Sequence, residues 1–345
     1  MSSAAPGDSA NAGASERPTV LAAAFSVAVT PVTPATPTTP GAPTAASSAP
    51  PTILPAATVT PEPWSSLRRF TPARIALGRA GNSLPTAAHL AFQLAHAQAR
   101  DAVHWPFDAP NIDAALVPLG LKVLQLHSDA PDRASYLQRP DWGRRLCEAS
   151  GRALQEFMRD KNEITRGTDS VFDLTWVIAD GLSALAVNQH APALVRELLS
   201  LLEQEAQYPY ALAPVCLVKN GRVAVGDTIG QTLRSKLVVV LIGERPGLSS
   251  PDSMGIYVTW QPHVGCTDAQ RNCISNVRPA GLPLPAAAAK LHHLLKAARR
   301  LQLTGVMLKD EFDPEPPHLS RTEAVWSGSA GEGVRQEPPA DLLRG

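Results

Sequence analysis

The chain has 345 residues, with 31 basic and 31 acidic side chains, 33 prolines and four cysteines. This balance of charge argues against nucleic acid or an anionic membrane as a partner, because such binding needs an excess of basic residues. Four cysteines cannot form the dense disulfide framework of a small secreted protein. No apolar run approaches the roughly 20 residues needed to cross a bilayer. These features favour a soluble, cytoplasmic protein.

Proline is concentrated towards the two ends, and ten prolines fall in residues 1–60 among Ala, Ser, Thr and Val. Such a segment cannot bury enough apolar area to offset the cost of ordering it, about 1–2 kcal/mol per residue. The apolar stretch 19–29 has the length of a signal-peptide core but lacks a basic segment before it, so we interpret it as part of the tail. The expected organisation is a disordered tail, a helical N-terminal part, an α/β domain and a second disordered tail, over residues 1–62, 63–165, 166–312 and 313–345.

The N-terminal part predicts two helices and one strand. Residues 85–104 are rich in Ala, with apolar side chains at helical spacing. Residues 121–126 alternate apolar and polar side chains, which is typical of a half-buried strand. Pro140 is expected to open a second helix. The face of that helix should carry Leu146, Ala149, Ala153 and Phe157.

Four apolar runs in the second half predict strands, over residues 174–179, 237–242, 256–259 and 305–308. One helix is expected after the first of these strands, with Pro192 in its first turn and Val195, Leu198, Leu199 and Leu202 facing inward. Another is expected over 285–301, with Leu291, Leu294, Leu295 and Ala298 in the core. Uniformly apolar strands separated by helices predict an α/β fold with a mostly parallel sheet flanked by helices.

Ligands of such sheets bind outside the carboxyl ends of the strands. Two polar, glycine-bearing loops directly follow apolar runs, at residues 180–183 and 243–247. From the residues alone we expect an α/β ligand-binding or enzyme domain. Its cleft should be lined by Asp180, Arg222, Glu244, Arg245 and a loop over residues 265–278.

Several common catalytic and binding motifs are absent from the sequence. There is no GxxxxGK[ST] phosphate loop, no GxGxxG after a strand, no GxSxG and no HExxH. The cysteines lack the CxxC spacing of a zinc site, so we expect each to be buried and free. Two weaker hypotheses stay open: an acid/base pair of Asp180 and Glu244, and catalysis by the serines at 249, 250 and 253, which turn formation explains as well.

Six longer strings, taken together, resemble one family, the small or light subunit of ethanolamine ammonia-lyase. The resemblance covers roughly residues 64–310, in order and without large gaps. The strings are TPARIALGRAGNSLPTAAHLAFQLAHAQARDAV (71–103), SYLQRPDWGRRL (135–146), VIADGLSALAV (177–187), GRVAVGDTIG (221–230), VVLIGERPGLSSPDSMGIYVTW (239–260) and RNCISNVRP (271–279).

This resemblance implies a Rossmann-like α/β subunit of an adenosylcobalamin-dependent lyase that converts ethanolamine to acetaldehyde and ammonia. The implied partner is a large TIM-barrel subunit in a six-plus-six assembly, with the cofactor held at the interface and its own base still on cobalt. Three implied cofactor contacts carry over by motif: Val223 in the GRV string, Glu244 in GERPG and Cys273 in RNCISN. No catalytic residue and no protein ligand to cobalt are implied for this chain.

Two other classes of function remain open at this point. A stand-alone small-molecule binding module can have the same fold, because a fold does not determine a function. An independent acid/base enzyme would use Asp180 and Glu244. An obligate subunit differs from both in leaving a large apolar surface on the free chain. The sequence also leaves open whether the N-terminal tail directs the complex to a bacterial microcompartment.

Overall fold

The sheet that the apolar runs predict is present in the computed structural model, which describes residues 62–162, 172–204 and 209–312. It has six strands in the order β1-β3-β2-β4-β5-β6. The first four strands in this order are parallel, whereas β5 and β6 run antiparallel to their neighbours. The strands are β1 Val123–His127, β2 Phe172–Ala179, β3 Val215–Lys219, β4 Ser235–Gly243, β5 Met254–Trp260 and β6 Arg271–Val277.

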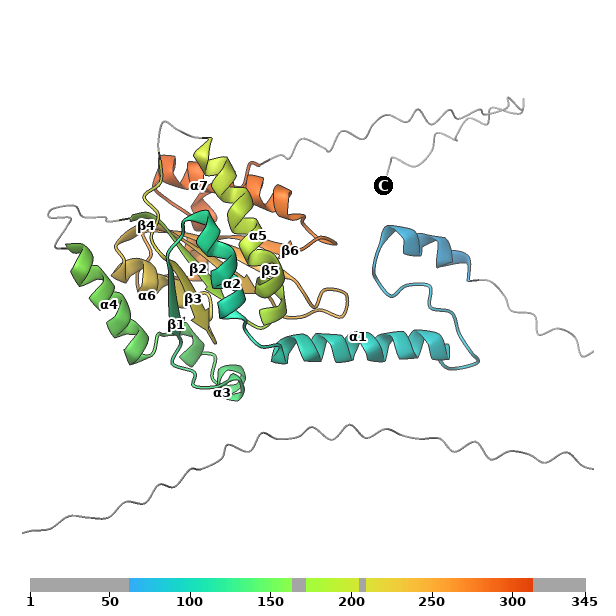
Figure 1. The fold of residues 1–345 in the computed structure, drawn as a ribbon. Coiled ribbons are helices and arrows are strands. Elements are labelled where there is room, and N and C mark those ends of the chain that lie inside the picture. The colour runs from blue at the N-terminus through green and yellow to red at the C-terminus, as the bar shows by residue number, and fades with distance from the viewer. Residues whose placement is uncertain (1–61, 163–171, 205–208, 313–345) are drawn as a thin grey trace, which may run out of the picture. The chain divides into compact units, whose positions relative to one another are not determined.

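Helices cover both faces of the sheet, as the uniformly apolar strands predict (Figure 1). One core packs the sheet against α2, α5 and α7, and the other packs it against α4 and α6. The α-helices are α1 Thr86–His104, α2 Ala109–Leu116, α3 Arg133–Gln138, α4 Glu148–Asn162, α5 Ala184–Glu203, α6 Val225–Thr232 and α7 Leu284–Leu301. The 3-10 helices are η1 Pro63–Phe70, η2 Val117–Leu119, η3 Trp142–Arg144, η4 Asp268–Gln270 and η5 Gly305–Met307.

Four predicted strands and two predicted helices are confirmed. The strand expected at 121–126 is β1, and those at 174–179, 237–242 and 256–259 are β2, β4 and β5. The helices expected at 85–104 and 285–301 are α1 and α7, and all four predicted core residues of α7 are buried. Strand β1 comes from the part expected to be helical, and it pairs with β3 in the same sheet.

The strand predicted at 305–308 is wrong, because this run forms η5 and the start of a turn. Gly305 has a φ of 82°, and an added Cβ there would lie 2.0 Å from the carbonyl oxygen of Ala269. Thr304 fastens the segment beside β5 and β6 by donating to the Gln270 carbonyl and accepting from the Trp260 N–H. The apolar side chains of Val306 and Met307 are exposed rather than buried in a sheet.

Two helix starts and one helix face are also corrected. Helix α4 begins at Glu148 rather than Pro140, and its buried side chains are Ser150, Leu154 and Met158 instead of the predicted face. Helix α5 begins at Ala184, so Pro192 lies inside it and not in its first turn. The helix extends ahead of this proline because its first turns are buried against the sheet.

Strands β3 and β6 were not among the predicted elements. Strand β6 occupies most of the segment expected to be the 265–278 loop. Its polar side chains alternate irregularly with apolar ones because a register shift interrupts its pairing with β5. The two expected tails, including the apolar stretch 19–29, lie outside the described residues except for Glu62.

Candidate functional site

The carboxyl ends of β2 and β3 form a topological switch point. These strands are neighbours, but the helix after β2 (α5) covers one face of the sheet and the helix after β3 (α6) covers the other. A crevice opens between adjacent strands where their connections diverge in this way. The predicted loop at 180–183 and the segment 220–224 both begin at this point.

Two glycines bring the predicted loops together. Gly181 has a φ of 57°, and an added Cβ would come within 2.2 Å of the carbonyl oxygen of Gly243. At Gly243 an added Cβ would lie 1.9 Å from the carbonyl oxygen of Ser183. The N–H of Leu182 donates to the Gly243 carbonyl at 2.9 Å. Only glycine permits this approach, so the loops after β2 and β4 form one surface, as the sequence predicted.

Asp180 fixes the third segment of this surface. Its Oδ1 accepts from the N–H of Gly221 at 3.0 Å, and its Oδ2 lies 3.5 Å from Nη1 of Arg133. Burial raises the pKa of this carboxyl, while the Arg133 charge and the backbone N–H groups of Asn220 and Gly221 act against that rise. Asp180 therefore positions the backbone that leads to Arg222.

Two hollows lie side by side on this surface and share Arg222, Val223 and Tyr257. The first has a volume of about 420 Å³ and is also lined by Glu244 and Arg245. The second has a volume of about 430 Å³; its other lining residues are Arg144, Ala224, Cys266, Thr267, Asp268 and Arg271. Of the predicted cleft, the structure thus joins Arg222, Glu244, Arg245 and part of the 265–278 segment.

The Glu244 carboxylate is held by hydroxyl and backbone donors. Ser253 donates to Oε2, Ser275 donates to Oε1 at 2.6 Å, and the N–H of Asn276 donates to Oε2 at 3.2 Å. Among the described residues, Glu244 forms no ion pair with an arginine. The carboxylates of Asp180 and Glu244 thus have separate partners, and no described contact joins them as an acid/base pair.

Tyr257 and Cys273 face each other across β5 and β6. Neighbouring groups partly desolvate the Cys273 thiol and thereby raise its pKa, and a hydrogen bond with the Tyr257 hydroxyl opposes that rise. The expectation that every cysteine is buried is wrong: Cys273 is exposed, Cys147 and Cys266 are half-buried, and Cys216 is buried. Cys273 is exposed because its side chain lies on the face of β6 opposite to α7.

That face of the two strands carries Gly255, Tyr257 and Cys273, and we call it the open face. The main helix contacts of β5 and β6 are with α5 and α7, which pack on the opposite face. Glu244 lies over one end of the open face, since a Cβ added to Gly255 would be 3.0 Å from its Oε1. The structure thus brings Glu244 and Cys273 to one surface, and Val223 to the hollows beside it.

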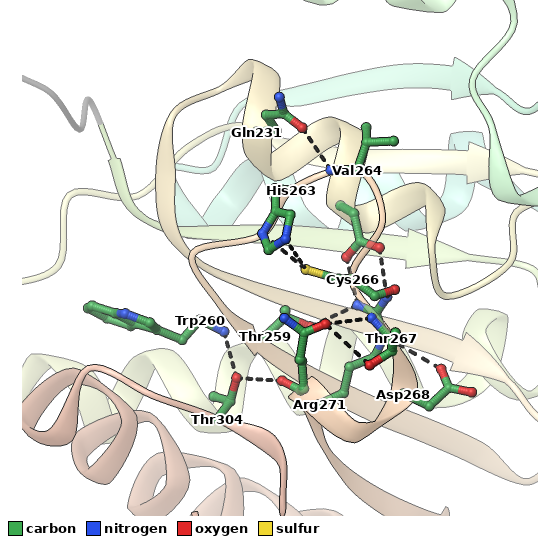
Figure 2. A network of polar contacts seen from close by, with 12 residues as sticks. Gln231, Thr259, Trp260, His263, Val264, Cys266, Thr267, Asp268, Arg271 and Thr304 are labelled. Atoms are coloured by element: carbon green, nitrogen blue, oxygen red, sulfur yellow. Dashed lines mark hydrogen bonds and ion pairs between the residues drawn. The ribbon is translucent and has the colours of Figure 1, made fainter. Parts of the chain in front are cut away.

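The other end of the open face is closed by a buried ion pair that the sequence did not reveal. Arg271 of β6 binds Asp227 of α6 through two bonds of 2.6 Å, and both side chains are nearly inaccessible. The same guanidinium donates to the Thr259 hydroxyl and the Cys266 carbonyl (Figure 2). Nearby, Cys266 Sγ lies 3.3 Å from Nδ1 of His263.

Sequence reasoning also missed two tyrosines. The buried Tyr136 donates to the carbonyl of Gly221 at 3.2 Å, and burial raises the pKa of its hydroxyl above the usual range. The sequence feature that could have indicated Tyr136 is an aromatic residue within a polar string, SYLQRPDWGRRL. Tyr257 alternates with the buried Ile256 and Val258, which marks it as facing the other side of the strand.

The serine cluster proves to have separate structural roles. Ser253 donates to Glu244, Ser250 exchanges backbone hydrogen bonds with Gly247, and Ser249 accepts from Arg74. Asp252 lies 3.4 Å from His190 and 3.6 Å from Arg278. These partners indicate a fastened turn rather than an activated nucleophile. Within the described ranges, no group of three or more His, Cys, Asp or Glu side chains could hold a metal ion, and no helix is long and apolar enough to span a membrane.

Fold and site together define a class: an α/β protein with a mixed, mostly parallel sheet. Its candidate binding surface lies at a switch point and continues onto the open face of β5 and β6. The family model for ethanolamine ammonia-lyase light chain (EutC) matches residues 61–309. The chain belongs to this family.

Curated relatives are similar in sequence to this chain over most of their own length. A protein of Pseudomonas fluorescens is 56% identical over 255 residues, which are 74% of this chain and 89% of that protein. A protein of Azotobacter vinelandii is 53% identical over 278 residues, which are 79% of this chain and 97% of that protein. A protein of Pseudomonas aeruginosa is 57% identical over 252 residues, which are 73% of this chain and 88% of that protein. All three are named ethanolamine ammonia-lyase small subunit.

Proposed function

We propose that the chain is the small subunit of an adenosylcobalamin-dependent ethanolamine ammonia-lyase, which converts ethanolamine to acetaldehyde and ammonia. In this proposal the chain covers the cofactor at an interface with a large TIM-barrel subunit, in a six-plus-six assembly. The observation that carries it is that Val223 and Glu244 line one hollow and Cys273 lies beside it, opposite Tyr257, in a chain of this family.

The shape of this surface fits one face of a corrin. A corrin is a broad disc rimmed by amide groups, so it needs a wide surface more than a deep pocket. The two adjoining hollows and the open face of β5 and β6 provide such a surface. The buried Nε of Arg222, which has no hydrogen-bond partner among the described residues, is a polar atom at the place where the hollows meet.

Glu244 fits the rim of such a ligand. A carboxylate accepts about four hydrogen bonds, and three described donors already occupy Glu244. One acceptor position is left for a corrin amide N–H, while the two serines and Asn276 hold the carboxylate in place. Val223 and Cys273 offer small surfaces that let the disc approach closely.

In this proposal the cofactor, when bound, supplies the radical chemistry of the lyase reaction. The side chains of this chain bind its rim, fix its position and exclude water from one face. We assign no catalytic residue and no cobalt ligand to the chain.

Exposed apolar side chains support an obligate partner. They are concentrated in the first described segment, residues 63–105, which contains η1 and α1. Eight large apolar residues there are exposed: Trp64, Leu67, Phe70, Leu84, Leu90, Phe92, Leu94 and Trp105. Monomeric proteins rarely expose large apolar patches, so eight exposed apolar side chains in one segment favour a subunit over a stand-alone binding module.

Expression of the chain with and without a large subunit tests the proposal. We expect the chain alone to show no deamination, and the pair to co-purify, to bind adenosylcobalamin and to release ammonia from ethanolamine. The visible absorbance of the purified pair would report the bound corrin. Turnover by the chain alone, or full activity of the large subunit without it, would contradict the proposed division of labour.

A further inference from the structure

Arg222 is a fixed cation beside the hollows. Its guanidinium lies 4.5 Å from the centre of the buried Tyr136 ring, and its backbone N–H donates to the Gly143 carbonyl at 2.7 Å. Its stem packs so closely on Gly143 that a Cβ added there would lie 2.8 Å from Arg222 Cγ. Arg222 is therefore held in one place before any ligand arrives.

Most of the other charges near the two hollows have partners, and the exceptions among the described residues are the exposed arginines Arg144 and Arg245. Arg133 pairs with Asp180, and Arg271 pairs with Asp227. Asp268 is fully exposed and lies nearest to Arg271. Among the described residues, no carboxylate forms an ion pair with Arg222 or with Arg144, which lines the second hollow together with it.

We propose that Arg222, assisted by Arg144, binds the phosphodiester of the nucleotide loop of a cobalamin. This inference rests on the proposed function. The side chains around a corrin are neutral amides, whereas the phosphodiester is anionic. The planar guanidinium matches the geometry of phosphate oxygens and forms charge-assisted hydrogen bonds with them. Because both hollows include Arg222, a ligand that spans them has this guanidinium beside it.

Two truncated corrins that differ only in the phosphate isolate this contact: cobinamide and cobinamide phosphate. Their dissociation constants are measured by visible absorbance with the co-purified two-subunit complex, in a buffer free of phosphate. We expect the unmodified complex to bind cobinamide phosphate about 10- to 100-fold more tightly, the range of a charged hydrogen bond. Arg222→Met should remove most of this difference in affinity between the two corrins, and Arg222→Lys should remove part of it.

Arg145→Met is the matched control. Arg145 is the neighbour of Arg144 in sequence, is paired with Asp129 at 3.2 Å and lines neither hollow. The complex with this variant should keep the full difference in affinity between cobinamide phosphate and cobinamide. Arg144 is exposed, so Arg144→Met should not disturb the fold. This variant should reduce the difference in affinity between the two corrins, and it replaces the Arg222 variants in the test if those fail to co-purify.

Equal affinity of the unmodified complex for the two corrins would overturn the inference while leaving the proposed function standing. An equal loss for both corrins in a folded Arg222→Met complex, or an unchanged difference in Arg144→Met and Arg222→Met alike, would also overturn it. Failure of the unmodified complex to bind any corrin, adenosylcobalamin included, would instead overturn the proposed function, and this inference with it.

Discussion

The two faces of β5 and β6 are built from the same strands but have different tasks. Towards α5 and α7 the strands present Ile256, Val258 and Ile274, all buried in an apolar core. On the open face they present Gly255, Tyr257 and Cys273, and Tyr257 lines both hollows. One face stabilises the fold, and the other remains available for a ligand. The difference teaches that the surface proposed to bind the cofactor lies where the helices no longer cover the sheet.

The largest effect on stability is expected at the ion pair that closes the open face. Asp227→Ala leaves the buried Arg271 guanidinium without its carboxylate, because both oxygens of Asp227 bind it. We expect a loss of about 3–5 kcal/mol in the free energy of unfolding. Denaturant titration of the variant and the unmodified chain measures the loss. A loss below about 1 kcal/mol would show that the pair does not hold α6 against β6.

A pair of truncations compares the two faces directly. Ile256→Ala, on the covered face, should reduce the free energy of unfolding by about 2–5 kcal/mol, since Ile256 is fully buried. Cys273→Ala, on the open face, should change it by no more than about 0.5 kcal/mol. The same denaturant titration applies to both. Similar losses at the two positions would mean that the open face is part of the core.

Glu244→Gln tests whether the carboxylate beside the open face contributes to binding a ligand. The amide keeps the shape of the carboxylate but loses its charge and one acceptor oxygen, so its bonds from Ser253, Ser275 and Asn276 are weakened. We expect the affinity of the two-subunit complex for adenosylcobalamin to fall about 10-fold, or about 1.4 kcal/mol. Ser249→Ala, in the same loop region but not bound to Glu244, is the control and should leave the affinity unchanged.

The sequence predicted β2 and β4 well because these strands are buried on both faces, whereas β3, which is equally buried, was not predicted. A continuous apolar run such as residues 237–242 has few alternatives, and the strand order then placed the loops after β2 and β4 at one edge. Strand β6 escaped prediction because its open face is polar and its pairing with β5 is irregular. The run at 305–308 is equally apolar but is held by Thr304 and Gly305 as a 3-10 turn.

The site was only partly predictable, for a related reason. Asp180 and Glu244 follow strands directly, so their approximate place was evident from the chain. The partners that determine their roles come from distant segments. Arg133 belongs to α3, which precedes Asp180 by a whole helix and strand, and Ser275 lies 31 positions after Glu244. Only the folded structure shows that Asp180 supports a loop while Glu244 faces the open surface.

The most direct test of the account is the accessibility of the Cys273 thiol. In the free chain Cys273 is exposed, and Cys147, on the segment before α4, is a free thiol that lines neither hollow. The rates at which N-ethylmaleimide modifies the two thiols are followed by peptide mass spectrometry, in the two-subunit complex with and without adenosylcobalamin. We predict that the cofactor slows modification of Cys273 at least about 10-fold and leaves Cys147 unchanged, because a disc on the open face covers one thiol and not the other. Equal rates at Cys273 with the cofactor bound and absent would contradict the claim that the open face holds it.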